Sequence, residues 1–167
     1  MDIRPTTKAD IAAVDALLAH SYPALLKADY LASVLVTALP IISRARPELV
    51  TCGTYYGAFE NGILRGAGGW TLGAPSGGRR RNRVGHIRHV VTDPDHIRRG
   101  IGTRLMVHTL QVARTYGVTR MMCQATRTAV PFYRSVGFEV LRDILVPLRP
   151  GIDFPAVEMT SLLADGS

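Results

Sequence analysis

The chain has 167 residues, 47% of them hydrophobic and 20% charged, which indicates one folded domain over residues 1–167 and excludes a largely disordered protein. The longest apolar run, 31–42, is too short to span a bilayer. With only two cysteines and no export signal at the N-terminus, we expect a cytoplasmic protein without disulfides.

The formal net charge of +7 favours anionic partners. Much of the excess lies in "RRRNR" at 79–83, which we expect to be a solvated loop. Nucleic-acid binding is not favoured, because no aromatic platform or helical reader accompanies this loop.

The first part of the chain predicts a short strand at 3–7 followed by two helices. Apolar residues recur at helical spacing after the strand. Pro23 is expected to interrupt this pattern, and a second helix is expected at 25–39.

The middle of the chain predicts three strands. Asn61-Gly62 separates two β-type runs, 48–60 and 62–72, and this dipeptide predicts a hairpin. A third strand is expected at 84–92. After it, helices are expected at 101–116 and 128–137. Strands are expected at 119–126, 138–148 and 156–163. The predicted order is β-α-α-β-β-β-α-β-α-β-β, an α/β fold around a mixed sheet.

The stretch "HIRHVVTDPDHIRRGIGTRLMVHTL" at 86–110 predicts a phosphate site. A strand breaks at Asp-Pro, and "RRGIGT" opens the following helix. Glycine lets a ligand approach the backbone, and the free amides of a helix N-terminus point at an anion. The turn is neither a Walker loop nor the dinucleotide fingerprint.

Together with "FYRSVGF" at 132–138, the strand, turn and helix resemble the GNAT superfamily of acyl-CoA-dependent N-acetyltransferases. The resemblance implies a mostly antiparallel sheet flanked by helices, and acetyl-CoA as co-substrate with no metal. It also implies main-chain groups that bind the pantetheine arm and the pyrophosphate, here Val90 and Thr92, and Arg98, Arg99, Gly100, Ile101, Gly102 and Thr103. The chain departs from the family at Ile97, where Gln or Arg is usual.

The resemblance further implies Tyr133 as the acid that protonates the departing thiolate. His86 stands fourteen residues before Gly100, a spacing at which family members carry the base that deprotonates the amine, and His89 or water are alternatives. Cys123 is not expected to act as a nucleophile, since the family transfers directly to the amine.

Regular alternation in the strand 84–92 would give two faces. A bulge there would exchange the faces. Without a bulge, His86, Arg88 and Val90 would share one face, and Ile87, His89 and Val91 would share the other.

The function implied is transfer of an acetyl group to a primary amine of a small molecule by direct attack in a ternary complex. The alternatives are a non-catalytic acyl-CoA-binding module, and an acetyltransferase for a protein or a tRNA-linked amine. A homodimer stays open, since dimers are frequent in the family. Residues expected near the acceptor by analogy are Tyr22, Tyr30, Trp70 and the loop 149–154. Asp29 and Asp153 either hold an ammonium group or are solvated carboxylates.

Overall fold

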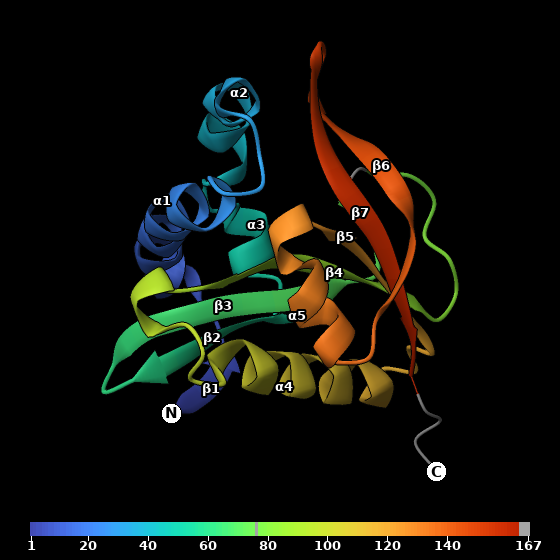
Figure 1. Ribbon diagram of the computed structural model, residues 1–167. Helices are drawn as coiled ribbons and strands as arrows, with labels where there is room; N and C mark the ends of the chain where they lie inside the picture. Colours follow the sequence, from blue (N-terminus) through green and yellow to red (C-terminus); the bar gives the residue numbers. More distant parts are fainter. Residues whose placement is uncertain (76, 164–167) are drawn as a thin grey trace.

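The computed structural model describes residues 1–75 and 77–163, and its core is a seven-stranded sheet (Figure 1). The strands are β1 (Asp2–Pro5), β2 (Tyr55–Glu60), β3 (Ile63–Thr71), β4 (Val84–Thr92), β5 (Arg120–Ala125), β6 (Glu139–Arg149) and β7 (Ile152–Leu162). The helices are α1 (Ile11–Leu26), α2 (Ala32–Ile42), α3 (Pro47–Val50), α4 (Ile101–Thr115) and α5 (Val130–Ser135). The predicted order is confirmed, with the four-residue α3 added before β2.

The sheet is mixed and mostly antiparallel, as predicted, with the strand order β1-β2-β3-β4-β5-β7-β6. The parallel pair is β4 and β5, and it is short. Val84–His86 pair with Arg120–Met122, and the register of this pair ends there. Beyond that point β5 continues alongside β7 while β4 continues alongside β3. The sheet therefore opens between its two central strands.

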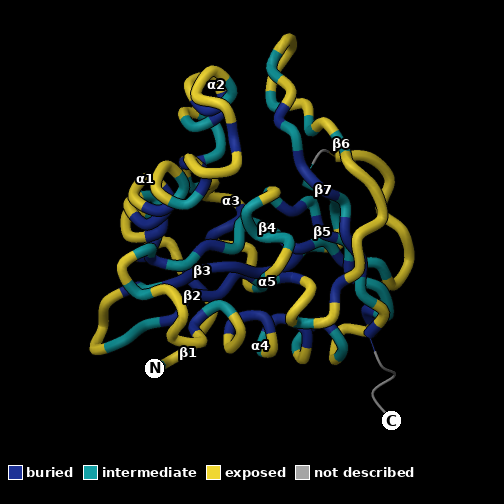
Figure 2. The backbone as a smooth tube through the Cα atoms, in the orientation of Figure 1, coloured by how far each residue is buried: buried dark blue, intermediate teal, exposed yellow. Residues whose placement is uncertain are grey.

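The two faces of the sheet are covered by different helices. On one face, Leu105 and Met106 of α4 pack with Met121 of β5, and α5 lies on the same side. On the other face, Val14 and Leu18 of α1 pack against the sheet. Figure 2 shows β3 mostly buried, whereas β6, an edge strand, is largely exposed.

The helices α1 and α2 each contain a proline, so the prediction that Pro23 interrupts a helix is wrong. Pro23 lies inside α1, and the helix expected at 25–39 is Ala32–Ile42 with Pro40 inside it. A helical proline leaves the carbonyl four residues earlier without its donor. These carbonyls belong to Ala19 and Val36, which are exposed and can bind water instead.

A bulge interrupts the pairing of β3 with β4. Ala67 pairs with Val91, but Gly69 pairs with Arg88, so three steps along β4 match two along β3. His89 lies within this bulge and has a φ of 42°, in the left-handed region that non-glycine residues rarely adopt.

The bulge exchanges the faces on which the side chains of β4 lie. The predicted regular alternation is therefore wrong beyond the bulge. Ile87 packs into the α4 core cluster, whereas Val91 packs into the α1 cluster, and Val90 lies against the α4 cluster. A side chain of β2 stabilises the bulge, because the Tyr55 hydroxyl donates a hydrogen bond to the His89 carbonyl at 2.8 Å.

The connections follow the turn signals of the sequence. Asn61 and Gly62 both have positive φ in the turn between β2 and β3, as the hairpin prediction requires. Arg79–Arg83 lie in an exposed connection before β4. In residues 1–75 and 77–163, none of the helices combines the length and apolarity needed to cross a membrane.

Candidate functional site

The turn before α4 presents unpaired backbone amides. Arg98 and Gly100 have φ values of 63° and 77°, and α4 begins at Ile101. Within the described residues, the amides from Arg98 to Thr103 donate to no protein acceptor, and the first amide that does so is that of Arg104, to the Gly100 carbonyl at 3.0 Å. A Cβ on Gly100 would meet nothing within 4 Å. Successive amides facing open space at a helix N-terminus form an anion site.

Gly102 packs the turn against α5 and β4. A Cβ at this position would lie 3.1 Å from the Phe132 ring and 3.4 Å from the Thr92 hydroxyl oxygen. The second glycine of "RRGIGT" therefore has a packing role, while the first leaves the space above the turn free.

The two arginines of the turn differ in their partners. Arg99 donates to a Glu60 carboxylate oxygen at 2.8 Å, which holds its guanidinium against the β2–β3 hairpin. Arg98 and Ile97 are exposed. Anion binding here rests first on main-chain donors, and Arg98 is better placed than Arg99 to add charge.

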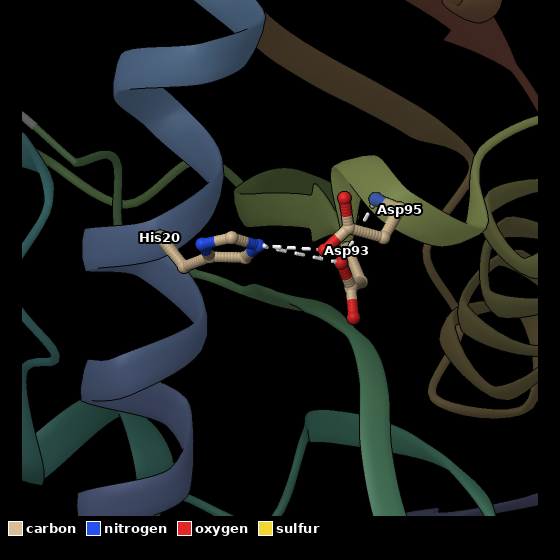
Figure 3. Close-up of side chains that lie close together, drawn as sticks. All are labelled: His20, Asp93 and Asp95. Atoms are coloured by element: carbon tan, nitrogen blue, oxygen red, sulfur yellow. Dashed lines mark hydrogen bonds and ion pairs between the residues drawn. The ribbon is translucent and has the colours of Figure 1, made fainter.

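Figure 3 shows how α1 is tied to the connection that follows β4. The His20 Nε2 atom lies 3.1 Å from an Asp95 oxygen and 3.7 Å from an Asp93 oxygen. Asp93 also faces Arg65 at 3.3 Å and His96 at 3.2 Å, and accepts from the Asp95 amide. Burial alone would raise the pKa of Asp93, but these donors and the His96 charge hold it below its usual range. With its carboxylate already in cationic contacts, the cluster fits a structural tie and not a metal site.

The edge of β4 that faces β5 is free beyond His86. Its other edge pairs with β3 as far as Thr92, and among the described strands none pairs with the free edge after residue 86. The main chain around Val90 and Thr92 thus borders an opening that leads to the turn before α4, where the sequence predicted pantetheine contacts.

Tyr133 of α5 lies beside Cys123 of β5, one residue beyond the last pair that β5 forms with β4. Its side chain is buried between Phe132 and Phe138, and its hydroxyl lies close to the Cys123 thiol. Burial and the neighbouring thiol raise the pKa of Tyr133 well above its ordinary value, and burial raises the pKa of Cys123 to about 12. Tyr22, from the opposite face of the sheet, also raises the pKa of Tyr133. Both groups therefore keep their protons at neutral pH.

A cleft of about 310 Å³ lies between the first two helices, the opened strands and the β6–β7 hairpin. Figure 1 shows α2 and this hairpin rising on opposite sides of the sheet opening. The polar lining residues are Arg44, Arg46, Arg88, His89, Gln124 and Thr126. The other lining residues are Tyr22, Ile41, Ile42, Ala45, Pro75, Ile87, Val146, Pro147, Leu148, Phe154 and Ala156. Among the described residues, this lining includes three arginines and no carboxylate.

The two candidate bases are not equally placed. His89 lines the cleft, and its Nδ1 atom is buried with no protein partner in the described structure. Burial first, and then the charges of Arg88 and Arg46, lower the pKa of His89 to about 4. His86 is half-buried outside the cleft lining, and burial and Arg88 lower its pKa.

Some acceptor-site predictions match the cleft. Tyr22 lines it, and so does Phe154 from the predicted loop, which belongs to β7. Tyr30 stacks behind Phe154 at 4.7 Å between ring centroids. Its hydroxyl donates to the Pro155 carbonyl and accepts from the Arg127 amide. Tyr30 therefore supports the cleft wall without lining it.

Other residues expected near the acceptor do not line this cleft, and the two carboxylates fit the alternative of solvated groups. Trp70 lies in the α4 core cluster, where its indole nitrogen donates to the Tyr56 hydroxyl at 3.3 Å. Asp29 is exposed and accepts from the Thr128 hydroxyl at 2.7 Å. Asp153 is exposed on β7, and neither carboxylate lines the cleft.

The three arginines of the cleft were not among the site residues predicted from the sequence. Arg44 and Arg46 lie in the connection from α2 to α3, and Arg88 lies beside the bulge. For Arg88, the sequence feature that could have indicated a site was an arginine between two histidines in "HIRH". This segment lies in a strand that was predicted to be half-buried.

Three comparisons bear on this site. The sequence profile of the acetyltransferase (GNAT) family matches residues 20–138. A glucosamine 6-phosphate N-acetyltransferase of Trypanosoma brucei brucei is 34% identical over 55 residues, which cover 33% of this chain and 37% of that protein. The match thus spans about a third of that relative.

Solved structures show the same fold. A GCN5-related N-acetyltransferase from Rhodopseudomonas palustris superposes with a TM-score of 0.77 at 20% identity, covering 97% of this chain and 95% of the other. The PaiA N-acetyltransferase of Thermoplasma acidophilum, solved with coenzyme A, has a TM-score of 0.72 at 14% identity, covering 96% and 98%.

Proposed function

Because the chain belongs to the acetyltransferase (GNAT) family, we propose that it transfers an acetyl group from acetyl-CoA to the primary amine of a small molecule bound in the cleft. The membership confirms the resemblance drawn from the strand, turn and helix motif, and the predicted fold agrees with it. The observation that carries the proposal is the course of β4. Its residues 87–89 line the cleft, and the strand then runs into the turn with unpaired amides.

The amides from Arg98 to Thr103 suit the diphosphate of acetyl-CoA, since they face open space at Gly100. The free edge of β4 around Val90 and Thr92 offers main-chain groups for the pantetheine arm. Acetyl-CoA supplies an acetyl thioester that an uncharged amine can attack.

Tyr133 is the proposed acid. Its phenol keeps its proton at neutral pH because burial raises its pKa, so it can donate to a thiolate at the opening between β4 and β5. Phe132 and Phe138 on either side fix the direction of its ring.

His89 is the proposed base, in preference to the His86 favoured by spacing. Its imidazole is neutral at pH 7, it lines the cleft, and its buried Nδ1 has no protein partner in the described structure, so this nitrogen is the proposed acceptor of a hydrogen bond from the amine. A pKa of about 4 makes it a weak base. Its role is therefore to orient the amine and to pass the proton to water.

The cleft volume supports a small acceptor. At about 310 Å³ it lies at the lower end of small-molecule sites, which range from roughly 300 to 1,000 Å³. A protein tail or a tRNA-linked amine would occupy more of the surface between α2 and the β6–β7 hairpin.

The test is release of free coenzyme A, followed with a thiol reagent, in the presence of acetyl-CoA and a panel of primary amines. We expect calorimetric binding of acetyl-CoA, and turnover on at least one small amine. Acetyl-CoA binding without turnover on any small amine, peptide or aminoacyl-tRNA would favour a non-catalytic binding module. The absence of acetyl-CoA binding would contradict the proposal.

A further inference from the structure

We propose that the acceptor amine carries an anionic group, a carboxylate or a phosphate, which Arg88 binds inside the cleft while an apolar body packs beside it. The inference rests on the proposed function, in which the cleft holds the acceptor.

Two of the three cleft arginines have structural partners. Arg44 lies 3.2 Å from an Asp15 oxygen, which also accepts from the Ala45 amide at 2.8 Å. Arg46 lies 3.7 Å from a Glu48 oxygen. These pairs hold the connection between α2 and α3 and partly neutralise both charges, so neither guanidinium needs a ligand.

Arg88 is different. Its Nη1 atom donates to the Thr71 hydroxyl at 3.1 Å, while its Nε atom is buried without a protein partner in the described structure. Among the described residues, no carboxylate lies within 4 Å of it. Burial, and then Arg46, lower its pKa, yet a guanidinium stays charged in proteins. A charged, partly desolvated group with an unused donor is a site for an anion.

Most of the remaining cleft lining is apolar. Ile42 of α2, Val146 and Leu148 of β6 and Phe154 of β7 line the cleft and belong to one hydrophobic cluster, and Ile41 also lines the cleft. Among the described lining residues none is a carboxylate that could hold a second ammonium group. The lining therefore selects one anionic group and one apolar body and disfavours polyamines.

The anion site and the base are neighbours at the bulge. Arg88 immediately precedes His89, both residues line the cleft, and each has a buried nitrogen without a protein partner in the described structure. Burial, and then the positive charges of Arg88 and Arg46, keep the imidazole uncharged. A molecule that carries its anionic group a few bonds from its amine, as an amino acid does, can engage both residues at once.

The test compares amines that differ in the anionic group alone. For the carboxylate, the probes are leucine, leucine methyl ester and 3-methylbutylamine; for the phosphate, O-phosphoethanolamine and ethanolamine. We expect the wild type to prefer the anionic member of one set, and that set identifies the anion. In Arg88→Gln, kcat/KM for that member falls by about tenfold to a hundredfold, since a charge-assisted bidentate contact is lost. The neutral member loses less than about threefold.

Two variants serve as controls. Arg81→Gln removes an equal charge from the exposed loop before β4 and should leave both rates unchanged. Arg88→Lys keeps the charge without the planar fork and should retain part of the preference. Equal losses on the anionic and neutral members, or a wild-type preference for the neutral amines, would overturn the inference.

A binding measurement separates this inference from the proposed function. The carboxylate 4-methylpentanoate has the leucine skeleton without the amine, and 2-hydroxyethyl phosphate is the matching phosphate. We expect one of them to bind the wild type by calorimetry, to bind Arg88→Gln about tenfold more weakly, and to leave acetyl-CoA affinity unchanged. Turnover on no amine would overturn the proposed function, and this titration would still decide the anion site. Competition with acetyl-CoA, or binding by neither anion, would overturn the inference.

Discussion

The turn before α4 and the cleft beside β4 both suit anions, but they are built differently. The turn is one continuous segment, residues 98–103, and its donors are main-chain amides held by two positive φ angles. The cleft is assembled from α1, α2, β4, β5, β6 and β7, and its charges are side chains on separate segments.

This difference predicts which substitutions should affect each site. Main-chain donors do not depend on side-chain identity, so the turn should tolerate substitutions that preserve its backbone. The cleft should change its acceptor when a single side chain changes, because Arg88 and His89 supply most of its unpartnered polar groups. Four substitutions test this contrast.

Tyr133→Phe should have the largest effect, because Tyr133 is the proposed acid for the departing thiolate. We expect kcat to fall roughly 10²-fold or more, the size of a lost general acid, with acetyl-CoA affinity unchanged. Tyr116→Phe removes an exposed phenol at the end of α4 and should retain full activity. Full activity of Tyr133→Phe would exclude the phenol as the acid.

Gly100→Val should disrupt the turn alone. A side chain would enter the space above the amides, and we expect acetyl-CoA affinity to fall roughly tenfold to a hundredfold by calorimetry, as donors to a charged group are lost. Gly62→Val is a matched control. Its φ is 78°, close to the 77° of Gly100, and a Cβ there also meets nothing within 4 Å. Equal loss of acetyl-CoA affinity in both variants would point to backbone strain instead.

His89→Asn should change the pH dependence of stability, since asparagine tolerates the positive φ at this position. The folded-state pKa of His89 is lowered from 6.5 to about 4, so the unfolded chain binds more protons between these values. The stability that the neutral imidazole contributes is complete above about pH 6.5 and is lost as pH falls through about 4.

The measurement is urea unfolding at pH 7 and pH 5. The wild type should lose up to about 2 kcal/mol more than His89→Asn between the two pH values, since each pKa unit corresponds to about 1.4 kcal/mol. Identical losses would show that His89 titrates normally and is solvated.

Arg99→Gln should have the smallest effect. Its guanidinium is held by Glu60 at 2.8 Å in a half-exposed pair, so it adds little to the turn. We expect acetyl-CoA affinity to change less than about threefold. A loss above tenfold would mean that Arg99 leaves Glu60 to bind the diphosphate.

The turn was predictable from sequence because it is local. A strand ending at Asp-Pro, two glycines and a helical pattern are contiguous, and backbone donors follow from helix geometry. The hairpin at Asn61-Gly62 was predictable for the same reason. The order of helices and strands along the chain followed from periodicity, although tertiary packing keeps Pro23 and Pro40 inside helices that the sequence rules would end.

The cleft was not predictable in the same way. A single bulge residue, His89, decides which side chains of β4 face the cleft, and nothing in "HIRHVV" identifies the residue with positive φ. The arginines of the α2–α3 connection approach Arg88 only in the folded chain. Trp70 shows the converse error, because an aromatic residue expected in a binding site fills the core instead.

The most direct test of the account is an initial-rate study with acetyl-CoA and the best amine both varied. If the turn and the cleft hold both substrates together on either side of Tyr133, double-reciprocal lines should intersect, as direct transfer in a ternary complex requires. Parallel lines, with acetyl-enzyme formed from acetyl-CoA alone, would contradict it and direct attention to Cys123.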